Sequence, residues 1–167
     1  MGAPLAQASM TTNGSSVPEA RFIRSDGTGV SLAELIGRRT LVLYFYPKDE
    51  TPGCTAEACG FRDAYEDFLA AGADVVGVSA DDAASHEAFK SKHRLPFLLV
   101  SDPGGAAARA LGVKRTLGLF AGRVTFVIDR QGHIRHRFES QLQVKRHVAE
   151  ALALVKSLEG TAERAAG

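Results

Sequence analysis

The most informative part of the chain is YFYPKDETPGCTAEACGFRD, Tyr44 to Asp63, where an apolar run leads through a short polar loop into a second apolar pattern. The run TLVLYFY, Thr40 to Tyr46, is continuous and rich in strand-forming residues, which is typical of a strand buried on both faces. Pro52 favours extended backbone at Thr51, the conformation of a helix N-cap, and itself suits the first position of a helix. We therefore expect a helix from about Thr51 to Ala71.

Cys54 falls at the third position of this expected helix, inside its first turn. Unpaired backbone N–H groups and the positive end of the helix dipole favour an anion there, so they stabilise a thiolate, which is the nucleophilic form of cysteine. At about 100° per residue, one stripe roughly 80° wide faces the sheet. Its members are Cys54, Ala58, Phe61, Tyr65 and Phe68. We therefore expect Cys54 to point inward at the edge of the core.

Cys59 is the second and last cysteine of the chain, and it lies about 140° around the helix from Cys54. In an intact helix the two Cα atoms are roughly 8.6 Å apart, beyond the ~7 Å limit for a disulfide. The two sulfurs can therefore bond only if the first turns of the helix unwind. Gly53, directly before Cys54, and Gly60, directly after Cys59, are weak helix formers and make unwinding easier.

The rest of the chain alternates between strand and helix patterns. Strands are expected at Asp74 to Ser79, Pro96 to Asp102, Arg123 to Asp129 and His133 to Phe138, the last two joined as a hairpin. Helices are expected at Asp82 to His93, in an Ala-rich stretch that ends near Gly112, and at Leu142 to Leu158. This order predicts an α/β fold with a mixed central sheet and helices on both faces. We expect a flexible N-terminal arm at residues 1–17, one domain at residues 18–160 and a C-terminal tail at residues 161–167.

Composition excludes several classes of protein. The chain has 167 residues, of which 45% are hydrophobic and 23% charged, so it can bury a core and does not have the composition of a disordered protein. A net charge of +1 argues against nucleic-acid binding. No apolar stretch approaches the ~18 residues that span a membrane, and the N-terminal residues do not have the pattern of a secretory signal. We therefore expect a cytoplasmic protein without membrane association.

The two cysteines and five histidines do not suggest a metal site, because a structural zinc ion needs about four ligands and no spacing here supplies them. We expect neither a metal nor another cofactor. Two close cysteines in a reducing compartment indicate redox chemistry instead. A lone cysteine on an apolar helix face is most often an inert hydrophobic residue, but the Thr-Pro-Gly start places Cys54 at an electropositive helix end and favours a reactive thiol.

The string PKDETPGCT holds Pro47, Thr51 and Cys54 in the pattern P-x-x-x-T-x-x-C, which marks the peroxiredoxins. The longer run FYPKDETPGCTAEAC, with a second cysteine five residues after the first, resembles the bacterioferritin comigratory protein or peroxiredoxin Q subfamily. The resemblance extends from about Val17 to Leu158 and implies a thioredoxin-like fold. The segment PEARFIRSDG lacks the family's usual A-P-D-F, and the GGLG and C-terminal Tyr-Phe elements of typical two-cysteine enzymes are absent.

The resemblance also implies a role for each matching residue. Cys54 is the peroxidatic cysteine, which attacks the O–O bond, and Cys59 is the resolving cysteine. Thr51 hydrogen-bonds the peroxide and the thiolate through its hydroxyl, and Pro47 shields the pocket from water. Arg123 matches the family's second-site arginine, which helps to hold the thiolate and the peroxide. Without the resemblance, Arg123 is interpreted as a solvated residue at a strand end.

The implied function is a thiol-specific peroxidase that reduces hydrogen peroxide and organic hydroperoxides to water and alcohols. Cys54 is oxidised to a sulfenic acid, Cys59 condenses with it to an intramolecular disulfide, and thioredoxin or glutaredoxin restores the dithiol. Two alternatives stay open, a peroxide redox sensor and a protein disulfide oxidoreductase, although the latter normally carries C-x-x-C. We expect a monomer rather than a dimer.

Overall fold

Parallel strands at the centre of the sheet and antiparallel strands at its edges give the mixed architecture that the sequence predicts. The computed structural model describes residues 14–116 and 120–166, and over these residues one seven-stranded sheet has the order β2-β1-β5-β4-β3-β8-β9. Its strands are β1 (Arg21–Arg24), β2 (Gly29–Ser31), β3 (Thr40–Phe45), β4 (Ala73–Ser79), β5 (Leu98–Ser101), β8 (Val124–Ile128) and β9 (Ile134–Glu139). Strands β3, β4 and β5 run parallel, and the other neighbouring pairs are antiparallel. A separate ribbon pairs β6 (Arg115–Thr116) with β7 (Phe120–Ala121).

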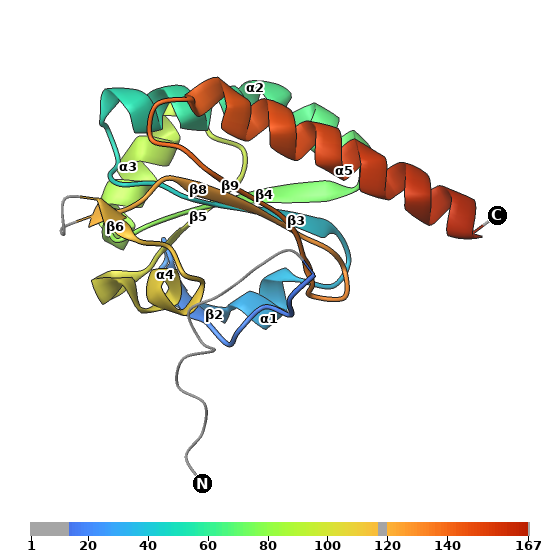
Figure 1. Cartoon of the computed structure of the whole chain (residues 1–167). Helices are drawn as coiled ribbons and strands as arrows, with labels where there is room; N and C mark the ends of the chain where they lie inside the picture. The colour runs from blue at the N-terminus through green and yellow to red at the C-terminus, as the bar shows by residue number, and fades with distance from the viewer. Residues whose placement is uncertain (1–13, 117–119, 167) are drawn as a thin grey trace, which may run out of the picture.

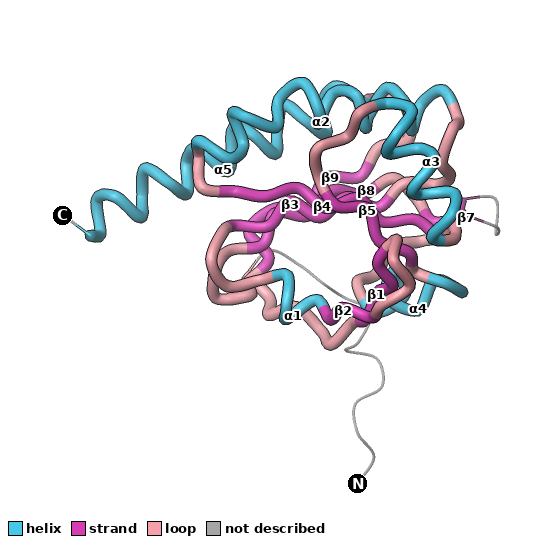
Figure 2. The backbone as a smooth tube through the Cα atoms, turned by 180° about the vertical axis from the view of Figure 1, so that it is seen from behind, coloured by secondary structure: helices cyan, strands magenta, loops and turns pink. Residues whose placement is uncertain are grey.

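Helices cover both faces of this sheet, as expected. They are α1 (Leu32–Leu35), α2 (Pro52–Ala70), α3 (Ala83–His93), α4 (Ala106–Ala110), preceded by a 3₁₀ turn at Pro103–Gly105, and α5 (Val144–Ala166). Helices α2, α3 and α5 lie on one face, with α2 and α5 side by side, while α1 and α4 lie on the other (Figures 1 and 2). Among the helices described, none is long and apolar enough to cross a membrane.

Strand β3 divides the core because both of its faces are buried. Leu41, Leu43 and Phe45 point to the α1 and α4 side, and Val42 and Tyr44 point to the α2 and α5 side. Every residue of β3 is buried, which confirms the interpretation of this run as a central strand. The carboxyl end of β3 therefore delivers the following loop to the start of α2 from a rigid support.

Helix α2 begins where the sequence predicts. Thr51 is its N-cap with extended backbone (φ −80°, ψ 150°), and Pro52 is its first residue. Cys54, Ala58, Phe61 and Phe68 of the expected inward stripe are buried, and Tyr65 is half-buried. Cys54 therefore reaches the third position of the helix and faces the core, as expected.

Several elements were not expected from the sequence. Strands β1 and β2, helix α1 and the β6–β7 ribbon are two to four residues long, too short for a periodic pattern to emerge. Helix α5 continues beyond Leu158 into the expected C-terminal tail and ends at Ala166. Of the expected N-terminal arm, residues 1–13 lie outside the described residues. Residues 14–17 lie beside the turn between β8 and β9 and are hydrogen-bonded to it. Ile134 N–H donates to the Ser15 carbonyl at 2.8 Å, and Val17 N–H donates to the Gly132 carbonyl at 2.9 Å.

Candidate active site

Cys54 is enclosed at the amino end of α2. Its exposed fraction is only 1%, and it packs with aromatic residues of the sheet and of its own helix, among them Tyr44 and Phe61. The side chain of Thr51 accepts no hydrogen bond from the first turn of α2. The first-turn N–H groups are therefore not satisfied by this cap, and they can stabilise a negative charge on the Cys54 sulfur.

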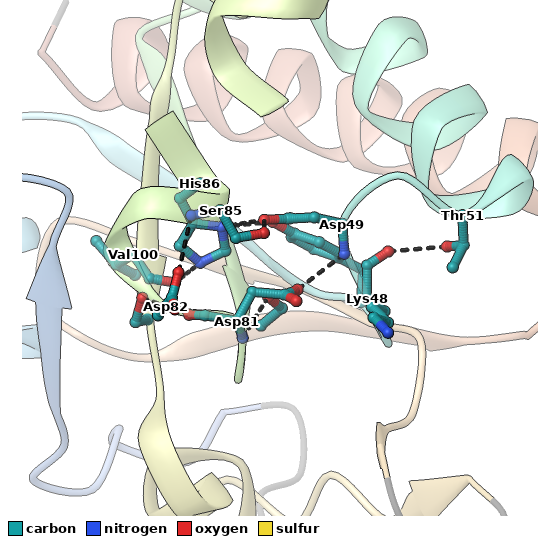
Figure 3. Close-up of polar contacts among 11 residues, drawn as sticks. Lys48, Asp49, Thr51, Asp81, Asp82, Ser85, His86 and Val100 are labelled. Carbon is teal, nitrogen blue, oxygen red and sulfur yellow. Dashed lines mark hydrogen bonds and ion pairs between the residues drawn. The ribbon is translucent and has the colours of Figure 1, made fainter. Parts of the chain in front are cut away.

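The hydroxyl of Thr51 instead donates to the Lys48 carbonyl, at 2.8 Å (Figure 3). Its proton is thereby occupied, and its oxygen keeps lone pairs that can accept a hydrogen bond. A thiolate only accepts hydrogen bonds, whereas a hydroperoxide carries an O–H donor. In this arrangement Thr51 suits the peroxide as a partner, and the expected bond from Thr51 to the thiolate requires the hydroxyl to turn away from Lys48.

Arg123 lies immediately before β8 and is buried, with an exposed fraction of 5%. This corrects the interpretation that the residues alone give, a solvated strand end. Its Nη1 donates to Glu57 Oε1 at 2.8 Å, and its Nε donates to the Gln141 carbonyl at 3.1 Å. Burial disfavours the guanidinium charge, but the Glu57 carboxylate and the Cys54 sulfur outweigh burial, so the pKa of Arg123 is raised.

Gly53 allows this guanidinium to approach the start of α2. A Cβ atom at Gly53 would lie 3.0 Å from Arg123 Nη2, closer than most side-chain contacts permit. A side chain at this position would displace the cation from the first turn. The glycine before Cys54 therefore has a packing role in addition to weakening the helix.

Glu57 is the residue of this site that the sequence analysis missed. It is completely buried, and burial raises its pKa to about 7 against the opposing influence of Arg123. Its Oε2 has no hydrogen-bond partner among the described residues and lies 3.6 Å from His147 Nδ1. The signal was in the sequence: three residues after Cys54, Glu57 falls at about 60° from it, on the edge of the inward stripe.

His147 of α5 completes the buried polar group beside Glu57. Its Nε2 donates to the Ser140 carbonyl at 2.7 Å, so its Nδ1 is left to accept from the Thr125 hydroxyl at 2.7 Å. Burial lowers the pKa of His147, and the nearby Arg123 acts in the same direction. The neutral ring thus adds no second positive charge beside the Glu57–Arg123 pair.

Cys59 and Pro47 occupy less central places. Cys59 is half-buried on another flank of α2, and both thiols are free. It lies at the edge of a hollow of about 800 Å³ between α2 and the start of α5, lined by Ala56, Cys59, Gly60, Leu142, Val144 and Val148 among others. Pro47 is half-buried directly after the buried Tyr46, and its shielding role stays a prediction.

The described side chains contain no group of three or more His, Cys, Asp or Glu residues that could hold a metal ion. The site itself combines one enclosed sulfur with a guanidinium, a hydroxyl and a helix terminus. Such an arrangement stabilises an anionic nucleophile and the negative charge of a leaving oxygen.

Comparisons with known proteins agree with this geometry. The sequence profile of the AhpC/TSA family matches residues 13–137. The chain belongs to the AhpC/TSA family. It is 47% identical over 148 residues to the chloroplastic peroxiredoxin Q of Oryza sativa subsp. japonica, a match that covers 88% of this chain and 68% of that protein. The expected family and subfamily are therefore confirmed, and the chain is a thiol peroxidase of the peroxiredoxin Q type.

Solved structures confirm the thioredoxin-like peroxiredoxin fold. The peroxidoxin BcpB of Mycobacterium tuberculosis superposes with a TM-score of 0.83 at 34% identity, over 89% of this chain and 99% of that one. The bacterioferritin comigratory protein of Xanthomonas campestris, studied for its alkyl peroxide reduction activity, gives a TM-score of 0.75 at 36% identity, over 84% and 92% of the two chains. Because the rice relative is chloroplastic, these comparisons do not support the expected cytoplasmic location, which stays a prediction.

Replacing Glu57 by Gln should flatten the pH dependence of stability between about pH 4.5 and 7. The raised pKa of Glu57 means that the folded state binds more protons than the unfolded state in this range, so the free energy of unfolding falls as the pH rises. A shift of the pKa from 4.5 to about 7 corresponds to a change of about 3 kcal/mol in the free energy of unfolding.

Urea unfolding at pH 4.5 and at pH 7 measures how the free energy of unfolding changes with pH. The exposed Glu66 of the same helix supplies the control, Glu66→Gln. Equal slopes in the wild type and Glu57→Gln would contradict the assignment.

Proposed function

We propose that the Cys54 thiolate attacks the terminal oxygen of a hydroperoxide. The S–O bond forms as the O–O bond breaks, so the sulfur is oxidised to a sulfenic acid and the peroxide is reduced. The leaving hydroxide or alkoxide takes a proton from water and departs as water or an alcohol. Arg123 and the first-turn N–H groups of α2 stabilise its developing charge. The observation that carries this proposal is the enclosed Cys54 beside a guanidinium that Glu57 holds in place.

Cys59 then resolves the sulfenic acid. Its sulfur attacks the Cys54 sulfur, the S–S bond forms, and the hydroxyl of the sulfenic acid leaves as water. Because both cysteines lie on the continuous helix Pro52–Ala70, with Cα atoms roughly 8.6 Å apart, this step requires the start of α2 to unwind. Catalysis thus depends on local unfolding after each oxidation.

The reductant is proposed to be an external dithiol protein, thioredoxin or glutaredoxin, which attacks the disulfide at Cys59. In the dithiol form Cys59 is half-buried, whereas Cys54 is enclosed, and for this reason we place the attack at Cys59. The apolar hollow beside Cys59, with Leu142 exposed at 92%, offers a contact surface for such a protein. A monomer with the single domain 18–160 remains our proposal for the assembly.

Peroxide consumption tests this function. Purified protein is mixed with hydrogen peroxide or cumene hydroperoxide, thioredoxin, thioredoxin reductase and NADPH, and NADPH oxidation is followed. A parallel assay contains glutathione, glutaredoxin and glutathione reductase. We expect turnover that depends on peroxide in at least one assay. A protein that forms its disulfide but turns over in neither assay would instead be a sensor or an exchange protein.

Thr51→Val should lower the rate constant of Cys54 oxidation by about tenfold to a hundredfold, because the peroxide loses one acceptor that orients it. The substitution keeps the size of the side chain and removes only the hydroxyl. Competition with horseradish peroxidase for hydrogen peroxide measures the rate. Thr55→Val, one turn further along the same helix, is the matched control. An unchanged oxidation rate in Thr51→Val would show that the Thr51 hydroxyl has no role in the peroxide step.

A further inference from the structure

The peptide group between Lys48 and Asp49 joins the active site to a polar network on the neighbouring strands. Its carbonyl accepts the hydroxyl of Thr51 at 2.8 Å, and its N–H donates to Asp81 Oδ2 at 2.8 Å (Figure 3). A peptide group is planar, with its C=O and N–H pointing in opposite directions. Fixing the N–H direction therefore fixes the direction in which the carbonyl holds the Thr51 hydroxyl.

Asp81 is itself held firmly. The Ser79 hydroxyl donates to Asp81 Oδ2 at 2.6 Å, and Asp81 N–H donates back to Ser79 Oγ at 3.1 Å. The Ser101 hydroxyl, at the end of β5, donates to the Asp81 carbonyl at 2.6 Å. Two adjacent strands of the rigid sheet thus position the carboxylate that receives the Asp49 N–H.

The side chain of Asp49 anchors the other side of the same peptide. Its Oδ1 accepts the Tyr46 hydroxyl at 2.6 Å, and its Oδ2 lies 2.8 Å from both Ser85 Oγ and His86 Nδ1. The second nitrogen of His86 faces the Val100 carbonyl at 3.1 Å, so both ring nitrogens face acceptors. Burial disfavours the carboxylate, but bonds from His86 and Tyr46 prevail, so the pKa of Asp49 is lowered.

The backbone that follows these anchors is strained at one residue. Glu50 has a φ of 65°, in the left-handed region that a residue with a side chain rarely adopts. Its carboxylate contacts Lys92 Nζ at 3.2 Å and His93 Nε2 at 3.6 Å, both on α3. A loop in this conformation persists only where its surroundings fix it.

We propose that Asp81 is a positioning residue for the peroxide step. It orients the Lys48–Asp49 peptide, so that the Thr51 hydroxyl keeps donating its proton to the Lys48 carbonyl. The oxygen of Thr51 then always presents lone pairs to the O–H of the bound hydroperoxide. Without Asp81 the peptide can rotate, and the hydroxyl alternates between donor and acceptor orientations. This inference rests on the proposed function, since it assigns a cause to the acceptor role of Thr51.

Asp81→Ala is the direct test, and Asp82→Ala is its matched control. Asp82 is the adjacent carboxylate and the N-cap of α3, where its Oδ1 accepts a hydrogen bond from Ser85 N–H at 2.8 Å. In the described structure its side chain makes no hydrogen bond to residues 47–51. We expect Asp81→Ala to slow Cys54 oxidation by hydrogen peroxide about tenfold, with Asp82→Ala within twofold of the wild type. Alkylation of Cys54 by iodoacetamide, which uses no peroxide acceptor, should keep its wild-type rate in both variants. An equal loss of the rate of Cys54 oxidation in Asp81→Ala and Asp82→Ala would overturn the proposal.

A double-mutant cycle separates positioning from general destabilisation. In a Thr51→Val background the hydroxyl is gone, so Asp81→Ala should cause no further loss of rate. Asp81→Asn keeps an acceptor oxygen and should stay within about threefold of the wild type. Additive losses in the double variant, or equal losses in Asp81→Asn and Asp81→Ala, would overturn the proposal. A wild type without peroxidase activity would instead refute the proposed function.

Discussion

Cys54→Ser removes peroxide turnover, with a loss of at least about a thousandfold in the rate of peroxide consumption. A serine hydroxyl at this position is not ionised at neutral pH and cannot take the place of a thiolate that attacks oxygen. The two side chains have nearly the same size, so the enclosed site and the Glu57–Arg123 pair are retained. Peroxide loss in the thioredoxin-coupled assay measures the effect.

The second cysteine provides the control for this substitution. Cys59→Ser makes the same chemical change on the same helix, five residues away. It should leave the first oxidation by peroxide intact, which shows that loss in Cys54→Ser is specific to one sulfur. Residual turnover of Cys54→Ser at a tenth of the wild-type rate would mean that another group reduces the peroxide.

Cys59→Ser has the other large effect, on cycling rather than on the first oxidation. One equivalent of peroxide should still oxidise Cys54 at the wild-type rate, because the enclosed site is unchanged. Turnover supported by thioredoxin should fall by at least about a hundredfold, since no disulfide forms for a dithiol protein to attack. NADPH oxidation under multiple turnover, compared with the single-turnover rate, separates the two steps.

A small dithiol supplies the control here. Dithiothreitol can enter the site and reduce the sulfenic acid directly, so it should restore part of the turnover of Cys59→Ser. Normal cycling of this variant with thioredoxin would refute the resolving role of Cys59. No recovery with dithiothreitol would point to damage at Cys54 itself.

The sequence determines α2 so strongly because its signals are local. Thr51 and Pro52 fix the start of the helix by their own backbone preferences, and the apolar spacing fixes the face that carries Cys54 inward. The buried β3 follows in the same way from a continuous apolar run. The short strands β1 and β2 give no such signal, because they are held by pairing with each other and with β5.

The partners of Cys54 could be predicted only in part, because they come from distant positions in the chain. Arg123 was assigned through a family resemblance, whereas its residue type and strand-end position indicate a solvated side chain. Its burial follows from Glu57, 66 residues earlier, which neutralises it inside the core. Glu57 was detectable by its helical angle, but His147 becomes part of the site only through the packing of α5 against α2.

The network behind Thr51 illustrates the same limit. Asp49, Asp81 and His86 lie in separate loop and helix segments, and no periodic pattern links them. Parallel pairing of β3, β4 and β5 places the ends of these strands at one edge of the sheet, which brings the three side chains together. Sheet order is a property of the whole chain, so local patterns cannot reveal this contact.

Mass analysis of the chain after one equivalent of hydrogen peroxide examines the identity of the reacting sulfur without any coupled enzyme. In Cys59→Ser, we expect a single added oxygen atom, located on the peptide that contains Cys54; in the wild type, we expect the loss of two hydrogens and a peptide cross-link between Cys54 and Cys59. Oxygen on Cys59 with Cys54 unmodified, or no oxidation of either thiol, would contradict the assignment of Cys54 as the peroxide-reducing group.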